Sequence, residues 1–214
     1  MKKTLYSLML SDDVVREIDI LAHRMGTNRS NLVNRILAEH VSLRTPEDEI
    51  NDIFRALEEI ISPSRDLVPF FEPNMQTMSL KSCLEYKYRP TVRYEVELYS
   101  SPRHGNVGVL SVILRTQSAA LIGAMAEFFS LWKQIEDTYL PSRFAAREYA
   151  LYDGKFTRSI ACKANMGTNE LAEGISNYVK LFDSLMKRYI SGTFSAEDVI
   201  AGYVNALKND DITV

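Results

Sequence analysis

Two glutamates, Glu95 and Glu97, have the spacing of a possible acid–base pair in a stretch where polar and apolar residues alternate. Side chains two apart in a β-strand share one face, so these carboxylates would lie side by side. The same alternation, which Arg93 continues, is typical of a solvated sheet face. No nucleophile motif, phosphate-binding loop or dinucleotide-binding glycine motif accompanies them. We therefore expect no catalytic residues and no enzymatic activity.

Candidate metal ligands are few and widely separated. The three histidines are His23, His40 and His104, and the two cysteines are Cys83 and Cys162. None of them has the close His-x3-His or Cys-x-x-Cys spacing of a metal site. We expect no metal, no cofactor and two reduced thiols.

Two further sets of side chains have the chemistry for a site. Three arginines near a predicted hairpin fit either an anion site or ordinary surface ion pairs: Arg143, Arg147 and Arg158. Three aromatic residues at helical spacing fit either a ligand pocket or, more commonly, a hydrophobic core: Phe128, Phe129 and Trp132. Neither set defines a site by its spacing alone.

The chain has 214 residues and a net charge of −3, with 46% hydrophobic residues, which is typical of a globular protein. No apolar run reaches the roughly 18–20 residues that span a bilayer. The apolar start is broken at Asp12 and Asp13, too early for a signal peptide, so we expect a cytoplasmic protein without a membrane segment. Residues 1–44 hold seven basic and five acidic residues and so carry +2, against −5 for the remainder. This distribution permits nucleic-acid binding through the N-terminal part.

The first 44 residues predict one strand and two helices. Residues 4–11 alternate, with Tyr6, Leu8 and Leu10 on one face and Leu5, Ser7 and Met9 on the other. Ser11 is a suitable N-cap for a helix that Gly26 ends, and Asn28 caps the second helix. A lone strand has no backbone partner and so small a core is marginal, so we expect two copies to pair their strands.

This order of elements resembles the ribbon-helix-helix repressors of the Arc/MetJ/CopG type. The matching stretch, residues 4–41, reads TLYSLMLSDDVVREIDILAHRMGTNRSNLVNRILAEHV. The resemblance implies a homodimer whose antiparallel ribbon enters the major groove of double-stranded DNA. By position, the residues facing the bases would be Leu5, Ser7 and Met9. The residues contacting phosphates would be Lys2, Lys3, Asn28, Arg29 and Ser30. The dimer core would contain Tyr6, Leu8, Leu10, Ile18, Leu21, Leu32 and Ile36.

The outward ribbon face departs from the family pattern, which usually places long polar side chains there. Leu5 and Met9 can touch thymine methyl groups, and Ser7 can form a single hydrogen bond. None offers the paired hydrogen bonds that are worth about 1–3 kcal/mol of base discrimination. Either DNA is bound mainly through phosphates and shape, or this face meets protein and the fold serves dimerisation.

The rest of the chain predicts a linker and a mixed body. Residues 45–77 predict a helix that starts at Thr45 and Pro46, followed by an irregular connector from residue 62. This helix would either relay between the two parts or pack on the body as a spacer. Beyond it the periodicity predicts strands at 80–88, 92–98 and 107–114, a hairpin at 149–161, and helices at 117–139, 168–190 and 195–207.

We thus predict an α+β protein in which a ribbon-helix-helix head, residues 1–44, precedes a linker, residues 45–77, and a body, residues 78–214. The body would be an antiparallel sheet with helices on one face. The expected function is a dimeric DNA-binding transcriptional regulator whose body senses a small molecule, binds a protein or extends the oligomer. The alternative is a protein-interaction module, either antitoxin-like or a scaffold. A deep polar pocket in the body would instead indicate an unrecognised enzyme.

Overall fold

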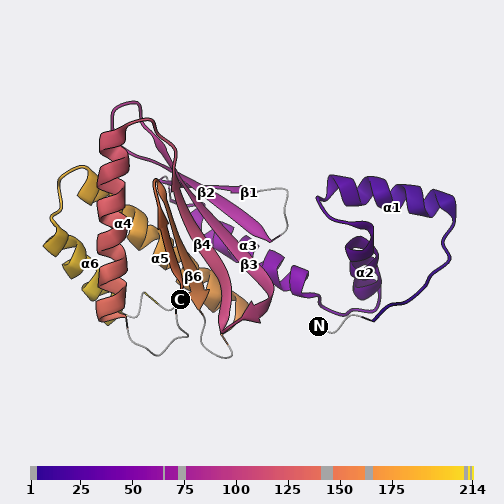
Figure 1. Ribbon diagram of the computed structural model, residues 1–214. Coiled ribbons are helices and arrows are strands. Elements are labelled where there is room, and N and C mark those ends of the chain that lie inside the picture. The colour runs from indigo at the N-terminus through magenta and orange to yellow at the C-terminus, as the bar shows by residue number, and fades with distance from the viewer. Residues whose placement is uncertain are drawn as a thin grey trace.

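The computed structural model describes residues 4–64, 66–71, 76–140, 147–161, 166–209, 212 and 214. The predictions made for Lys2, Lys3, Arg143 and Cys162 lie outside these residues. A small head contains helices α1 (Asp12–Arg24) and α2 (Arg29–His40), and it stands apart from a larger body (Figure 1). The remaining elements, in chain order, are α3 (Pro46–Ile61), β1 (Leu67–Phe71), β2 (Thr77–Cys83), β3 (Thr91–Arg103), β4 (Asn106–Leu114), α4 (Ala119–Tyr139), β5 (Tyr149–Tyr152), β6 (Lys155–Ala161), α5 (Thr168–Ile190) and α6 (Ala196–Lys208).

The two helices of the head are confirmed, and local chemistry explains their ends. Ser11 occupies the N-cap position of α1 with an extended backbone, although its side chain makes no capping hydrogen bond. Gly26, with φ of 60°, ends the turn after α1 because a left-handed backbone suits glycine. The Asn28 side chain accepts a hydrogen bond from the Asn31 backbone N–H and so caps α2.

The strand predicted over residues 4–11 is absent from the single chain. This segment precedes α1 without forming a strand, and the sheet of the body does not include it. A strand exists only when its backbone groups pair with a neighbouring strand. One copy supplies no such neighbour, so the ribbon of the predicted head is not confirmed in the isolated protomer.

The linker is packed on the body, and part of it was predicted wrongly. Helix α3 begins with a capping box between Thr45 and Asp48 and has Pro46 in its first turn. Its apolar stripe lies in the main core: Ile50, Ile53, Phe54, Leu57 and Ile61. Residues 67–71 form strand β1 rather than an irregular connector. Pro69 is tolerated there because β1 is an edge strand with one unpaired side.

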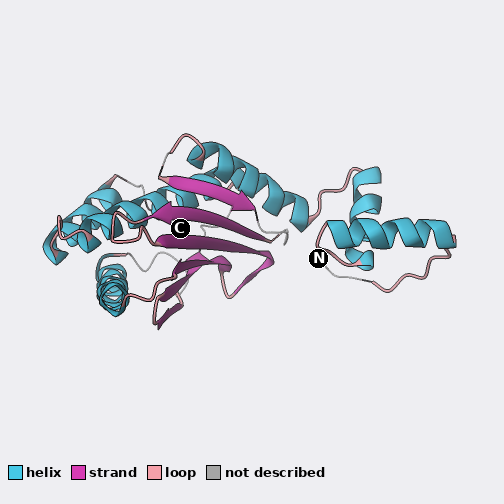
Figure 2. Ribbon diagram, turned by 90° about the horizontal axis from the view of Figure 1, so that it is seen from above, coloured by secondary structure: helices cyan, strands magenta, loops and turns pink. Residues whose placement is uncertain are grey.

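The body is a six-stranded antiparallel sheet in the order β1-β2-β3-β4-β6-β5, with helices packed against one face (Figure 2). Strand β3 shows the alternation clearly. Val92, Tyr94 and Val96 are buried on the helix side, while Arg93 and Glu95 lie on the open side. The predicted α+β class and antiparallel sheet are confirmed.

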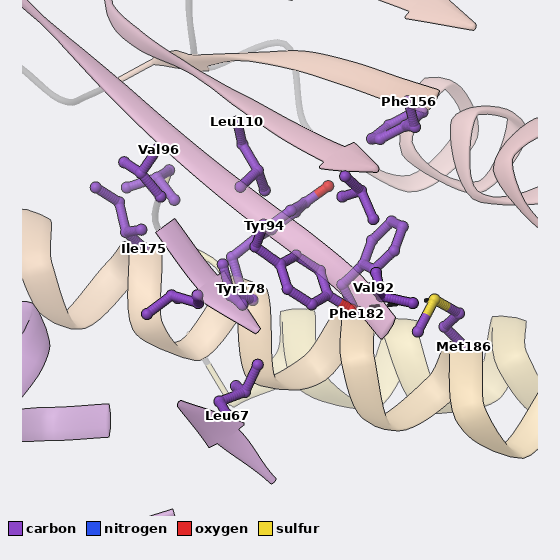
Figure 3. Close-up of a cluster of buried hydrophobic side chains, with 14 of the residues drawn as sticks. Leu67, Val92, Tyr94, Val96, Leu110, Phe156, Ile175, Tyr178, Phe182 and Met186 are labelled. Carbon is purple, nitrogen blue, oxygen red and sulfur yellow. Dashed lines mark hydrogen bonds between the residues drawn. The ribbon is translucent and has the colours of Figure 1, made fainter. Parts of the chain in front are cut away.

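One aromatic cluster joins the helices to the sheet. The Phe182 ring of α5 contacts rings from β3, β6, α4 and α5 itself: Tyr94, Phe156, Phe128, Phe129, Trp132 and Tyr178. Figure 3 shows this packing around Tyr94, whose hydroxyl points toward α5 near Met186. The three aromatics of α4 are fully buried, so of the two possibilities left open they belong to the core.

Strand β3 is longer than the strand predicted over residues 92–98, which makes the β3–β4 hairpin tight. Strand β3 continues to Arg103, and the chain reverses at His104 and Gly105, both with positive φ. The register then shifts between Asn106 and Gly108. A Cβ on Gly108 would lie 2.2 Å from the Glu97 carbonyl oxygen, so glycine permits this close approach of the two strands.

Candidate nucleic-acid and dimer interface

The head exposes far more apolar surface than its size would explain. Of the nineteen exposed large hydrophobic residues in the described part of the chain, twelve lie between Leu5 and Leu43. Leu5 is 97% exposed and Met9 is 102% exposed, and Tyr6, which was predicted to face inward, is 81% exposed. Large exposed apolar surfaces in proteins often mark interaction sites.

The residues predicted to form the dimer core are mostly uncovered within one chain. Tyr6, Leu8, Leu10, Leu21 and Ile36 are exposed, and Ile18 is half-buried. Leu32 is buried together with Ala22 and Ala38, each of which is less than a tenth exposed. The single chain therefore brings together only a minimal contact between α1 and α2.

The N-terminus of α2 combines a partial cap with an ion pair. Arg29 donates through Nε to Asp19 Oδ1 at 2.7 Å, and its Nη2 also contacts Asp19 Oδ2. These hydrogen bonds, with the Arg29 charge, hold the pKa of Asp19 below its usual value. Ser30 is exposed beside this pair. Sequence analysis missed Asp19, because ten residues and a helix reversal separate it from Arg29.

The first turn of α2 contains no acidic side chain, in contrast to the first turns of α1 and α3. The unpaired backbone N–H groups and the helix dipole make such a terminus favourable for an anion. Since Asn28 accepts from the Asn31 N–H, the earlier N–H groups of the turn are left for other acceptors.

Two ion pairs connect the head to the start of α3. The Nε atom of Arg35 lies 3.8 Å from Oδ1 of Asp48, and Nη2 of Arg44 contacts Oδ2 of Asp52. All four side chains retain solvent exposure, so these pairs stabilise the connection only weakly.

Among the described residues of the body, one of the two glutamates considered as an acid–base pair lies in an ion pair. Glu95 is paired with Arg93 on the open sheet face, so it is not a free carboxylate beside Glu97. Within the part of the chain that the structure describes, no group of three or more His, Cys, Asp or Glu residues could hold a metal ion. None of the described helices has the length and apolar character needed to cross a bilayer.

Arg158 lies neither in an open anion site nor in a surface ion pair, because its side chain is fully buried. Its Nε donates to Glu136 Oε2 at 3.0 Å, and its Nη2 donates to the Val214 carbonyl oxygen at 2.8 Å. The guanidinium also lies 4.3 Å from the Tyr178 ring centroid. A signal existed in the sequence: positions 156, 158 and 160 share a strand face, and Phe156 and Ile160 are apolar.

The Glu136 carboxylate is enclosed by two tyrosines as well. Tyr149 OH donates to Oε2 at 2.8 Å and Tyr203 OH donates to Oε1 at 3.3 Å. Burial, reinforced by the Glu136 charge, raises the pKa of both tyrosines well above the usual value. Burial and repulsion from Arg158 lower the pKa of Arg147, which lies beside this cluster. Glu136, Arg158 and Tyr203 of this cluster are buried, while Tyr149 is half-buried. The cluster joins α4, α6, β5 and β6.

Comparisons of the chain with protein-family models, with curated protein sequences and with solved structures find no significant match.

Proposed function

We propose that this protein is a dimeric DNA-binding transcriptional regulator whose residues 4–11 pair with the same segment of a second copy to form a ribbon. The observation that carries the proposal is the exposed, alternating segment 4–11, which precedes two helices whose apolar side chains are also exposed. Pairing across a two-fold axis would satisfy the strand backbone and cover the apolar helix faces together.

DNA contact would combine the ribbon with the N-terminus of α2. The acid-free first turn of α2 and the exposed Ser30 favour a phosphate there. Leu5 and Met9 would lie against base edges and contact thymine methyl groups. Because few groups read bases by paired hydrogen bonds, phosphate contacts and DNA shape would supply most of the affinity.

A matched pair of variants tests the ribbon. Leu8→Glu places a charge on the face expected to be inside the dimer, and Met9→Glu places the same charge on the face expected to meet DNA. We expect Leu8→Glu to give monomers in analytical ultracentrifugation, while Met9→Glu stays dimeric and loses DNA binding. If both variants remain dimeric, or if the unaltered protein is monomeric at micromolar concentration, the proposed ribbon is refuted.

The DNA itself is identified by sequencing fragments that copurify with the full chain. Fluorescence anisotropy on an enriched fragment then gives the affinity as a function of salt, with a slope of about −0.9 in log–log form for each phosphate neutralised. Arg29→Ala should weaken binding and flatten the slope, whereas Arg55→Ala, an equal charge change on α3, should leave both unchanged. A flat salt dependence would contradict DNA binding.

A protein-interaction module is the second candidate, and one observation favours it. The Arg29 charge is already matched by Asp19, and the outward face of segment 4–11 is largely apolar. In this case Met9→Glu would abolish capture of a protein partner while the protein shows no salt-dependent affinity for DNA.

A further inference from the structure

A polar groove of about 710 Å³ lies on the open face of the body sheet. Its walls come from the β3–β4 hairpin on one side and from β5 and β6 on the other. The β4–β6 register pairs Val109 with Ser159 on this face, opposite the buried face that holds Leu110 and Ile160. The groove lies away from the head, and its lining reaches Tyr149 and Arg158 of the Glu136 cluster. Its size is that of small-molecule sites.

One wall of the groove carries an available cation. The Arg103 guanidinium lies 4.2 Å from the centroid of the Tyr99 ring, and it makes no ion pair with any residue that the structure describes. The left-handed backbone at His104 and Gly105 closes the hairpin directly after it and places His104 in the same wall. A cation held against an aromatic ring without a carboxylate partner favours an anionic ligand group.

The neighbouring positions favour a hydrogen-bond donor on the same ligand. Asn106 lines the groove and is 5% exposed, yet its Oδ1 has no hydrogen-bond partner among the described atoms. Buried carbonyl oxygens are normally satisfied, so this one points to a donor that the chain itself does not supply. The exposed Glu148 lies in the opposite wall and adds negative charge.

We propose that this groove binds a small carboxylate that carries an amino group, such as an α-amino acid or a short peptide. Arg103 would pair with the carboxylate, while Asn106 and Glu148 would accept hydrogen bonds from the ammonium group. Tyr99 and Val109 would contact the apolar part. A phosphate dianion suits the groove less, because Glu148 would repel it. This proposal goes beyond DNA binding and does not depend on it.

Isothermal titration calorimetry on the full chain without DNA tests the proposal, with the standard L-α-amino acids and their diglycine-extended peptides as probes. We expect at least one probe to bind, and we expect the matching amine without its carboxylate to bind at least about tenfold more weakly. Arg103→Gln should produce the same loss. Arg115→Gln, an exposed arginine that does not line the groove, should bind normally.

Asn106→Leu distinguishes a ligand site from a purely structural residue. The substitution removes an unpaired buried acceptor, so the variant should keep its melting temperature while losing probe affinity. Should that variant fail to fold, Glu148→Gln at an exposed position examines the same ammonium contact. The proposal is overturned if no probe binds, if Arg103→Gln and Glu148→Gln bind like the unaltered protein, or if the carboxylate proves dispensable.

Discussion

Arg158 and Glu136 form an ion pair with Nε and Oε2 3.0 Å apart, and neither side chain is exposed to solvent. Burial alone would lower the pKa of Arg158, but the Glu136 carboxylate outweighs it and raises that pKa above the usual value. The pair links the C-terminal part of α4 to the centre of β6, and Val214 is held in the same cluster. The pair stabilises the fold because each of its two buried charges would be costly without the other.

Removal of one partner of this pair should be more damaging than removal of both. Arg158→Met removes the cation that is hydrogen-bonded to the buried Glu136 carboxylate, and we expect a loss of about 3–5 kcal/mol in the free energy of unfolding. The double variant Arg158→Met/Glu136→Gln should lose less, because no buried charge remains. Urea denaturation measures both values. A single variant no less stable than the double would contradict this account.

Three buried tyrosines and the half-buried Tyr149 should make the fold sensitive to alkali. Burial, with nearby Asp183 or Glu136, raises the pKa values of Tyr94, Tyr149, Tyr178 and Tyr203. The unfolded chain releases these protons near pH 10 and the folded chain only above it. Their stabilisation is therefore complete below about pH 10 and is lost as pH rises further, at up to about 1.4 kcal/mol per pH unit for each tyrosine.

Tyrosinate absorbance and unfolding, followed together over an alkaline titration, check this expectation. Four of the eleven tyrosines should ionise only as the fold is lost. Tyr149→Phe should remove the contribution of one tyrosine to the slope of the free energy of unfolding against pH. Ionisation of all eleven in a protein with native circular dichroism would show the prediction to be wrong.

The Asp19–Arg29 pair should restrain DNA binding. Asp19→Asn removes the carboxylate that competes with a phosphate for the Arg29 guanidinium, so affinity should rise and the salt slope should steepen, by less than the about 0.9 of one full phosphate contact. Asp13→Asn, on the same helix beside Arg16, makes an equal change of charge and serves as the control. An equal rise in DNA affinity in both variants would indicate an effect of net charge and would contradict a specific role of the Asp19–Arg29 pair.

Acid should weaken the Asp19–Arg29 pair. Because the pKa of Asp19 is lowered by Arg29, the contribution of the pair is present above the unfolded pKa of Asp19 and is lost as pH falls through its folded pKa. Any DNA contact that Asp19 restrains should therefore strengthen at strongly acidic pH only, and a nuclear magnetic resonance titration of the Asp19 carboxyl would locate the transition.

Tyr88→Gly should stabilise the protein. Tyr88 is exposed and has a φ of 68°, a left-handed conformation that costs a residue with a Cβ about 1–2 kcal/mol. Relief of this cost is partly offset by the greater freedom of glycine in the unfolded chain, so we expect the free energy of unfolding to rise by about 0.5–1 kcal/mol. Thermal unfolding measures it, with Tyr86→Gly in the same loop as the control that should not gain.

The elements that sequence analysis predicted well are those with local signals. Gly26, Asn28 and the Thr45–Pro46 pair mark helix ends through their own backbone and side-chain chemistry. Strand β1 was missed because it depends on pairing with β2, while Pro69 in its middle is typical of a connector. Its edge position, which permits the proline, is a property of the folded sheet.

The candidate sites were harder to predict, since they depend on contacts between distant elements. Asp19 meets Arg29 only through the crossing of α1 and α2, and Arg158 meets Glu136 only when α4 packs on β6. The strand predicted over residues 4–11 is not formed in the single chain. Its alternation is visible in the sequence, and its pairing with a second copy stays a prediction.

None of the head residues that the structure describes, 4–44, belongs to the hydrophobic core of the body, which begins with Ile50. The body can therefore fold by a first-order reaction within one chain. Under the proposed dimer, the head reaches its final packing only by a second-order encounter, whose rate rises with protein concentration. Newly made chains would complete their bodies long before their heads, and cellular abundance would set the moment at which DNA binding begins.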